Sequence, residues 1–339
     1  MTRGENKKKK FHINNVSLLI TIVLFVAMFI FGSIRYDHFF SISTFLNLFN
    51  DNAYLMIAGI GETFVLITGG IDISISSTVA FTGVFMAHCL EKGMPAFVVI
   101  CLALLIGITV GAVQGSLIHY FKLQPFIVTL AGQFLMRGLC VVISEASIPI
   151  NDSFFKGMAL GRIPISFGEA KPLNGKIYYY VLIVMVVLLV SIFVLKKLAF
   201  GRAIYAVGGN EQSAALMGLN VARTKIGVYI ISSFCAALAG IVFSFYTLAG
   251  YGLQNMGMEL DAISSAVIGG TLLTGGVGSV FGTMVGAMIQ GIIQTIVTYE
   301  NLNTWWTKVT IAGLLCLFIV IQRVIAVRAD AMKGKATAE

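Results

Sequence analysis

Long apolar runs alternate with short polar segments along almost the whole chain. A helix needs roughly 20 apolar residues to cross a hydrocarbon core about 30 Å thick, and many of these runs approach that length. The pattern therefore predicts about ten transmembrane helices, some of them short or broken. The predicted spans are residues 16–34, 52–69, 74–90, 95–120, 125–145, 177–197, 225–249, 260–274, 278–299 and 305–325.

Two predicted spans, 52–69 and 260–274, are short, and each is followed by a glycine pair and another apolar run. They close on the similar sequences Thr68-Gly-Gly-Ile71 and Thr274-Gly-Gly-Val277. Interrupted helices at corresponding positions of two related halves point to the path of a transporter. The similarity is consistent with an internal repeat and with two broken helices. The alternative is that Thr-Gly-Gly is only a turn.

The composition indicates a polytopic all-α membrane protein. Of the 339 residues 58% are hydrophobic and only 11% are charged, which excludes a soluble chain. No soluble domain is left over, so residues 1–339 are predicted to form one transmembrane domain. The five cysteines lie in apolar runs and are expected to be packing residues. Neither disulfides, a metal, a cofactor nor a nucleic-acid partner is predicted.

Basic residues cluster in three polar segments: the N-terminus (1–15), an internal loop (198–224) and the tail (326–339). Cytoplasmic segments carry an excess of Lys and Arg, and ten crossings place all three segments on one side. The pattern predicts that both termini are cytoplasmic and that the first span is uncleaved. The segments expected on the outer side are 35–51, 146–176, 250–259 and 300–304.

Asp72 lies between two apolar runs and is followed by Ser74, Ser76 and Ser77. A charged side chain at the centre of a membrane helix costs about 2.5 to 3.5 kcal/mol on insertion scales. Backbone groups freed by a helix interruption need partners at membrane depth. We therefore expect Asp72 to pin an interrupted helix by accepting hydrogen bonds from amides and hydroxyls. Direct contact with a transported solute is a further possible role.

Other polar residues form pairs one helical turn apart. Gln133 and Arg137 share one predicted span, and Gln290 and Gln294 share another. For the glutamines, hydrogen bonds between helices and a hydrated path are equally compatible with this spacing. Arg137 requires a carboxylate or backbone carbonyls as partners. Two carboxylates are candidates for Arg137: Glu62 and Asp72.

Small residues recur at helical spacing on two spans. Such faces let helix backbones approach closely, so packing is the main expectation and a moving interface is the alternative. The two sets are Gly107, Gly111 and Gly115, and Gly278, Gly282 and Gly286.

The internal basic loop contains a predicted short helix. Asn210 is a good N-cap, Glu211 complements the positive end of a helix, and Gly218 is placed to end it. The residues of this helix include an apolar run with no evident partner in the chain: Ala214, Ala215, Leu216 and Met217. This run is either a docking knob for another protein or part of a solvated connecting helix.

The chain contains no phosphate-binding loop, no H-E-x-x-H helix and no Ser-His-Asp candidate. We therefore predict a non-enzymatic protein. Concentrative transport requires either an ion gradient or a partner ATPase. Ion-coupled carriers often have carboxylates and histidines in several spans, and this chain has few, which favours the partner. An ion-coupled secondary carrier, a passive channel and a membrane scaffold are the alternatives.

Four segments resemble the permease subunits of ribose-type ABC sugar importers, and the resemblance extends nearly end to end. They are Thr68–Ser74, Tyr205–Asn210, Glu259–Thr271 and Gly275–Thr283. Within that family, Ser144–Asn151 and Asn303–Lys308 are similar to one of the two permeases of the bacterial galactofuranose importer. The chain departs from the family at two positions. Ser76 replaces a usual glycine, and Glu62 replaces an apolar residue.

The resemblance implies a multi-pass protein of the bacterial inner membrane. Its partners would be an ABC ATPase, a second and different permease, and a periplasmic sugar-binding protein. The helix from Asn210 to Gly218 would be the element that couples the permease to the ATPase. A path for a neutral sugar would be lined by amides, hydroxyls and aromatic rings, for which the candidates are Phe126, Gln133, Gln290 and Gln294.

Overall fold

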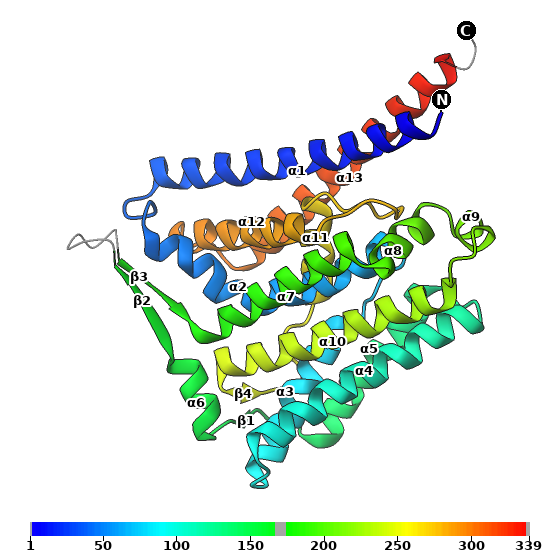
Figure 1. Cartoon of the computed structure of the whole chain (residues 1–339). Helices are drawn as coiled ribbons and strands as arrows, with labels where there is room; N and C mark the ends of the chain where they lie inside the picture. The colour runs from blue at the N-terminus through cyan, green and yellow to red at the C-terminus, as the bar shows by residue number, and fades with distance from the viewer. Residues whose placement is uncertain (1, 167–173, 337–339) are drawn as a thin grey trace.

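The computed structural model describes residues 2–166 and 174–336, with side chains from 18 to 165 and from 174 to 322. These residues form a mostly helical structure (Figure 1). The elements are α1 (Thr2–Arg35), α2 (Ile42–Ile67), α3 (Ile75–Glu91), α4 (Ala96–Tyr120), α5 (Pro125–Ile143), β1 (Ile148–Pro149), α6 (Ser153–Leu160), β2 (Arg162–Ser166), β3 (Asn174–Tyr178), α7 (Tyr179–Lys197), α8 (Ala199–Gly209), α9 (Glu211–Leu216), α10 (Val221–Thr247), β4 (Ala249–Gly250), α11 (Met258–Ile268), α12 (Val280–Tyr299) and α13 (Trp305–Ala336).

Within the described residues, 7 helices are long and apolar enough to cross a membrane. They are the 18–35 part of α1, then α4, α5, α7, α10, α12 and the 305–322 part of α13. The other three predicted spans coincide with α2, α3 and α11. At 1.5 Å per residue, the 11 residues of α11 extend only about 17 Å, roughly half of a hydrocarbon core. The count of ten crossings stays a prediction.

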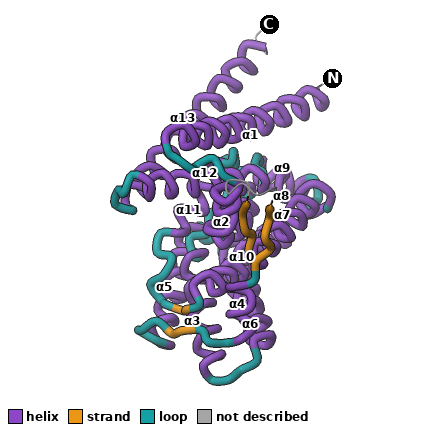
Figure 2. Tube along the Cα trace, turned by 90° about the vertical axis from the view of Figure 1, so that its left-hand side faces the viewer, coloured by secondary structure: helices purple, strands orange, loops and turns teal. Residues whose placement is uncertain are grey.

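Helices α2, α10 and α12 form the centre of the bundle. Helix α10 packs against α2, α3 and α4, whereas α12 packs against α2, α11 and α1. Figure 2 shows α1 and α13 leaving this bundle together towards the two termini. The glycine faces lie at two helix contacts. Gly107, Gly111 and Gly115 of α4 face α10, and Gly282 and Gly286 of α12 face the end of α11. The packing interpretation is confirmed for these five glycines. Gly278 is not part of the second face, because it precedes α12 and contacts Ile67 and Thr271 instead.

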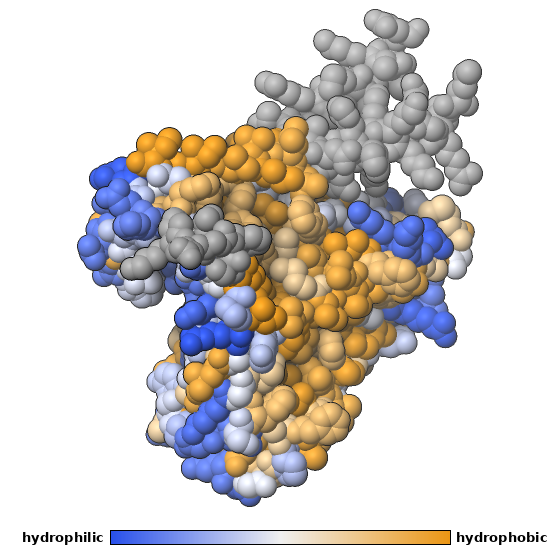
Figure 3. Space-filling view, turned by 60° about the vertical axis from the view of Figure 1, so that its left-hand side comes forward, coloured by the Kyte–Doolittle hydropathy of each residue, from blue (hydrophilic) through white to orange (hydrophobic). Residues whose placement is uncertain are grey.

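The outside of the bundle is apolar over broad areas (Figure 3). Large apolar side chains are exposed along α4, α5 and α7, as expected for helices in contact with lipid. Of the five cysteines expected to be packing residues, Cys89, Cys140 and Cys235 are buried, whereas two are not. Cys101 on α4 and Cys316 on α13 are exposed, because each lies on the outward side of a peripheral helix.

Helix α2 is longer than the predicted span 52–69. It begins at Ile42, and the Ser41 hydroxyl caps it by accepting a hydrogen bond from the Thr44 amide at 3.0 Å. The helix continues without interruption to Ile67. Residues 42–51, which the hydropathy pattern placed in an outer loop, are therefore helical.

The fold is not purely helical, because the described residues include two small antiparallel strand pairs. Strand β1 pairs with β4, and β2 pairs with β3 with Arg162 opposite Tyr178. Helix α6, capped by the Asp152 carboxylate, lies between β1 and β2. These elements occupy most of the predicted outer segment 146–176, and residues 167–173 of that segment lie outside the described residues.

The predicted basic loop 198–224 is largely helical. It contains α8, which was not predicted, and the short helix α9, which was. Figure 1 shows α9 and both chain ends at one end of the bundle, and the β2–β3 hairpin at the other. This arrangement is compatible with termini and α9 on the same side of a membrane, and the orientation itself stays a prediction. The side chains of the basic segments 1–15 and 326–339 lie outside the described residues.

Candidate functional site

The connection between α2 and α3 is held by the carboxylate of Asp72, which is fully buried. Its Oδ1 accepts hydrogen bonds from the Ser74 amide at 3.0 Å and the Ser74 hydroxyl at 2.6 Å. Its Oδ2 accepts a hydrogen bond from the Ser232 hydroxyl of α10 at 2.7 Å. These are the hydrogen bonds that the pinning interpretation of Asp72 requires. Any contact between Asp72 and a solute stays a prediction.

Two polar side chains from other helices extend this network. Gln114 of α4 donates a hydrogen bond from Nε2 to the Ser74 hydroxyl at 3.0 Å. Glu62 of α2 accepts one from the Asp72 amide at 3.2 Å, while its Oε2 has no hydrogen-bond partner among the described residues. The start of α3 is therefore held by residues of α2, α4 and α10.

Arg137 is held by backbone carbonyls, and it is bonded to neither of the suggested carboxylates. Its Nη1 donates to the carbonyl oxygens of Gly252 at 2.5 Å and Gln254 at 2.8 Å, and its Nη2 donates to the Ser76 hydroxyl at 3.3 Å. The turns before α11 supply these carbonyls, because they do not belong to a helix. The suggestion that Glu62 or Asp72 pairs with Arg137 is wrong.

We expect Asp72→Leu to destabilise the protein by about 2 to 6 kcal/mol. The apolar side chain leaves the Ser74 amide and the Ser232 hydroxyl buried without an acceptor, and each unpaired group costs about 1 to 3 kcal/mol. Asp72→Asn is the matched control, because its carbonyl still accepts from Ser74 and its amide donates to Ser232. The thermal unfolding midpoint of each purified variant in detergent, compared with that of the wild type, measures the change in stability. Equal midpoints for wild type and Asp72→Leu would contradict the pinning role.

Three glycine pairs from distant parts of the chain meet beside the end of α2. The Gly276 amide donates a hydrogen bond to the Ile67 carbonyl at 2.7 Å. A Cβ on Gly275 would lie 2.9 Å from the Gly69 amide nitrogen, and one on Gly208 would overlap the Ile67 carbonyl. Gly69, Gly275 and Gly276 have φ values between 75° and 81°, which glycine adopts without strain. The end of α8 is therefore docked on both Thr-Gly-Gly turns.

A hydrogen bond from a side chain strengthens this glycine junction, which we define as Gly69-Gly70, Gly208-Gly209 and Gly275-Gly276. The hydroxyl of Tyr205 on α8 donates to the Gly278 carbonyl at 2.9 Å. Helix α8 is thus joined to the segment between α11 and α12 at two neighbouring places. A displacement of α8 would be transmitted directly to both interrupted segments.

The four predicted path residues do not come together in one site. Gln290 donates to the Asp261 carbonyl at 2.9 Å and so joins α12 to α11. Gln133 donates to the Glu259 carboxylate at 3.2 Å. Phe126 is exposed near the start of α5, and Gln294 lines a separate pocket. For Gln290 and Gln133 the observed role is a hydrogen bond between segments, and the path role of all four stays a prediction.

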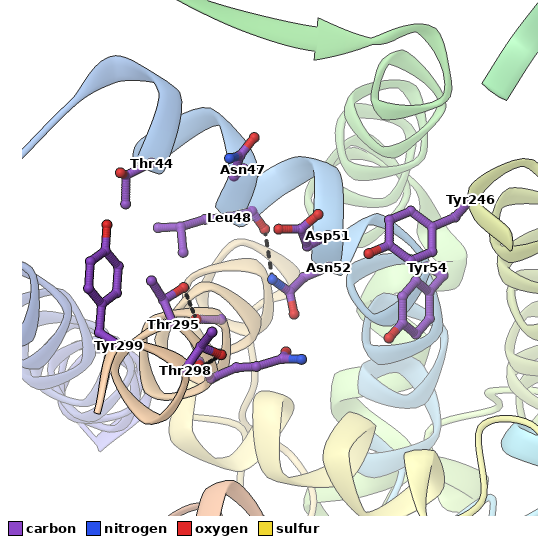
Figure 4. A pocket seen from close by; sticks show the side chains of 12 residues that line it. Thr44, Asn47, Leu48, Asp51, Asn52, Tyr54, Tyr246, Thr295, Thr298 and Tyr299 are labelled. Carbon is purple, nitrogen blue, oxygen red and sulfur yellow. Dashed lines mark hydrogen bonds between the residues drawn. The ribbon is translucent and has the colours of Figure 1, made fainter. Parts of the chain in front are cut away.

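The pocket that contains Gln294 has a volume of about 420 Å³ and lies between α2 and α12. Asn47, Asp51 and Tyr54 of α2 line it on one side, Thr298 of α12 lies on the other, and Tyr246 of α10 lies beside Tyr54 (Figure 4). The pocket is near the start of α2 and the end of α12, at the opposite end of the bundle from α9 (Figure 1). We call it the outer pocket.

A tyrosine contact closes the rim of the outer pocket. The Tyr36 ring lies 5.2 Å from the ring of Tyr299, measured between centroids, and the Tyr36 hydroxyl donates to the Glu300 carboxylate at 2.7 Å. This hydrogen bond is the main reason why the pKa of the Tyr36 hydroxyl is raised above its usual value. The contact ties the connection between α1 and α2 to the end of α12.

The short helix predicted after Asn210 is confirmed as α9. The Asn210 side chain accepts a hydrogen bond from the Ser213 amide at 2.7 Å, and the Lys225 ammonium pairs with the Glu211 carboxylate at 2.7 Å. Leu216 is 90% exposed and Met217 is 66% exposed. Ala214, which was predicted to belong to the exposed run, is buried, because the first turn of α9 packs on α8 and α10. Ala215, Leu216 and Met217 therefore form the apolar knob.

Sequence reasoning missed several residues of the network and of the outer pocket. Ser232 and Gln114 lie in ordinary apolar spans, and no local pattern connects them to Asp72. Asn47, Asp51 and Tyr54 do carry a signal, because they recur at helical spacing and would share one face of a helix. That signal was hidden by the prediction of a loop over 35–51.

Comparison with known proteins identifies the family of the chain. A family model described as the branched-chain amino acid transport system / permease component matches residues 44–320. The inner membrane ABC transporter permease protein YjfF of Escherichia coli is 43% identical, over 91% of this chain and 92% of that protein. The fructose import permease protein FruG of Bifidobacterium longum is 36% identical, over 95% and 96%.

The ribose import permease protein RbsC of Haemophilus influenzae is 32% identical, over 88% of this chain and 90% of that protein. No solved structure gives a significant match. The relatives are aligned over almost their full lengths, and the apolar helices agree with a multi-pass protein of the bacterial inner membrane. The chain therefore belongs to the family of ABC transporter permease components that includes ribose and fructose import permeases.

Proposed function

We propose that this chain is the membrane-spanning permease subunit of an ATP-driven importer of a monosaccharide. The observation that carries the proposal is the apolar knob on α9, which exposes Leu216 and Met217 at the end of the bundle that holds both termini. Exposed apolar groups of this kind mark protein interaction sites. A permease without a nucleotide site needs such a surface, because its energy comes from a separate ATPase.

The contacts of α8 support a mechanism for the coupling. Movement of the ATPase subunits pushes the apolar knob, and α9 transfers the push to α8, on which it packs. Helix α8 then shifts the glycine junction, which connects the ends of α2 and α11. The two interrupted segments move together, and the permease changes from outward to inward access. Asp72 and its hydrogen bonds keep the start of α3 in place during this movement.

The finer proposal concerns the sugar and the partners. The segments Ser144–Asn151 and Asn303–Lys308 favour galactofuranose as the substrate and a second, different permease as the partner in the membrane. The relatives named for ribose and fructose support a monosaccharide as the substrate class. A periplasmic binding protein would deliver the sugar to the end of the bundle that carries the β2–β3 hairpin and the outer pocket.

The proposed function is tested by measuring which energy source sugar uptake requires. We expect proteoliposomes that contain the permease pair, the ATPase and the binding protein to accumulate labelled sugar only when ATP is supplied to the ATPase. Collapse of the proton gradient with an uncoupler should leave this uptake unchanged. Uptake is measured with labelled D-galactose, D-ribose, D-allose and D-fructose, so that the substrate class is tested as well.

Three results would contradict the proposal. Uphill accumulation by the permease without an ATPase, lost on addition of the uncoupler, would identify an ion-coupled carrier. Equilibration of the sugar without accumulation, independent of ATP, would identify a channel. A chain that purifies with no ATPase and moves none of the four sugars would fit a membrane scaffold.

A further inference from the structure

The outer pocket lies between two polar helix faces of the bundle. On α2, Asn47, Asp51 and Tyr54 lie on one face, and on α12 Gln294 and Thr298 lie one turn apart. The two polar faces oppose each other across a cavity of about 420 Å³ (Figure 4). Two polar faces in a chain that is 58% hydrophobic require a reason.

Hydrogen bonds and ion pairs within the protein do not explain why these polar side chains are present. Within the described residues, the side chains of Asp51, Tyr54, Tyr246 and Gln294 form no hydrogen bond and no ion pair with another residue. Asp51 lies about 14 Å along α2 from its first residue, Ile42, so it is well inside the helix. Asp51 is nevertheless exposed, because its side chain lies at the cavity and not against a neighbouring helix.

The chemistry of the pocket selects the class of ligand. Among the described residues no lysine or arginine lines the cavity, so an anion or the carboxylate of an amino acid would find no positive partner there. Asp51 is the single carboxylate there, and all lining residues except Leu48 and Gly291 carry a polar group. Amides, hydroxyls, tyrosine rings and one carboxylate suit a neutral compound with many hydroxyl groups. The volume lies within the usual range of about 300 to 1,000 Å³ for small-molecule sites.

A second hollow adjoins the first. It has a volume of about 380 Å³ and shares Asn47, Asp51 and Tyr246 with the outer pocket. Its far side is formed by Tyr178 and Tyr180, whose rings are stacked with centroids 5.4 Å apart. Asp51 is therefore reached from both hollows, and tyrosine rings are present on either side of it.

We propose that the outer pocket is a binding site for a monosaccharide on its way into the permease. Asp51 accepts hydrogen bonds from two hydroxyls of the sugar, Gln294 and Thr298 bond further hydroxyls, and the Tyr246 ring covers an apolar face of the sugar. Charge-assisted hydrogen bonds to a carboxylate are shorter and about twice as strong as neutral ones, so Asp51 is the main anchor. This inference rests on the proposed function, because it assigns a site to the transported sugar.

A matched pair of threonine substitutions tests the site in the complete transporter. Thr298 and Thr109 are both exposed, and each donates a hydrogen bond to a carbonyl one turn earlier in its own helix, at 2.8 Å. Thr298 lies in the outer pocket, whereas Thr109 lies on the outside of α4. We expect Thr298→Val to lower sugar uptake about fivefold and Asp51→Asn to lower it more than tenfold. Thr109→Val should transport like the wild type.

Uptake is normalised to the amount of inserted transporter. It is measured with whichever of D-galactose, D-ribose, D-allose and D-fructose the wild type transports fastest.

A labelling experiment tests the same site. In a variant whose native cysteines are replaced by alanine, Thr298→Cys should react with a charged thiol reagent added from outside. The transported sugar should slow this reaction at least fivefold, and a sugar that is not transported should leave its rate unchanged. Equal uptake by Thr298→Val and Thr109→Val, or labelling of Thr298→Cys without protection, would overturn the site.

These results are separate from a failure of the proposed function. If the wild type shows no ATP-dependent uptake of any of the four sugars, the transport proposal is wrong. If the wild type transports one of them and the outer-pocket variants do so equally well, only the binding site is wrong.

Discussion

The double substitution Leu216→Asp, Met217→Asp should abolish ATP-dependent uptake while the permease remains inserted in the membrane. Both side chains are exposed, so the change costs little folding energy in the isolated chain. Burying a leucine or methionine side chain contributes about 1.5 to 3 kcal/mol, so an ATPase that covers both would lose about 3 to 6 kcal/mol. This loss weakens the association roughly a hundredfold or more. Sugar uptake and co-purification of the ATPase are measured together.

The control separates the loss of apolar contact from the added charge. Gln212→Glu places a new carboxylate on the same exposed helix and keeps the apolar knob, so it should retain most of the uptake. The exchange Leu216→Met, Met217→Leu keeps the apolar area and should also transport. Full uptake by the double aspartate variant would show that the ATPase docks elsewhere. A permease that fails to insert would be recognised by its absence from the membrane fraction.

The strongly apolar helices could be predicted from the sequence closely. The predicted span 95–120 corresponds to α4 (Ala96–Tyr120), and 278–299 corresponds to α12 (Val280–Tyr299). Neither helix contains a charged residue, and apolar residues predominate in both, so a hydropathy window finds their bounds. The cap at Asn210 was also readable, because an N-cap acts through residues within three positions of it.

The first part of α2 could not be predicted from hydropathy, because its polar residues are satisfied by tertiary contacts or face a pocket. Asn50 donates to the Lys176 carbonyl at 2.9 Å and accepts from the Tyr178 amide at 3.2 Å, so it binds strand β3. Asn47 and Asp51 face the outer pocket. A hydropathy window counts these residues as evidence for a loop, although each is compatible with a helix.

The glycine junction shows a second limit of sequence reasoning. The two Thr-Gly-Gly sequences predicted interruptions or turns at Gly69-Gly70 and Gly275-Gly276. Gly208-Gly209 was noted only as part of the segment Tyr205–Asn210, which resembles the family. Nothing in the local pattern indicates that the three pairs touch, since the contacts depend on how α2, α8 and α11 cross in space. The same is true of the Ser232 hydroxyl that binds Asp72. Contacts between residues distant in the chain require the fold.

The contact between α8 and the glycine junction leads to the second prediction of large effect, for the substitution Gly208→Ala. A Cβ at this position would overlap the Ile67 carbonyl and would lie 2.7 Å from the Gly276 amide nitrogen. Both atoms belong to the backbone and already bond each other, so they cannot move aside without breaking that hydrogen bond. The end of α8 must then leave the junction. We expect uptake to fall more than tenfold, with more ATP hydrolysed for each sugar imported.

Gly138→Ala on α5 is the matched control, because a Cβ there would meet no atom within 4 Å. Alanine in a helix interior is favoured over glycine by about 0.5 to 1 kcal/mol, so this variant should be as stable as the wild type and transport equally well. If Gly208→Ala imports sugar with the same ATP cost as the wild type, α8 does not transmit the movement. The push from the apolar knob would then have to reach α2 through α10, which packs against α2 and contacts both α8 and α9.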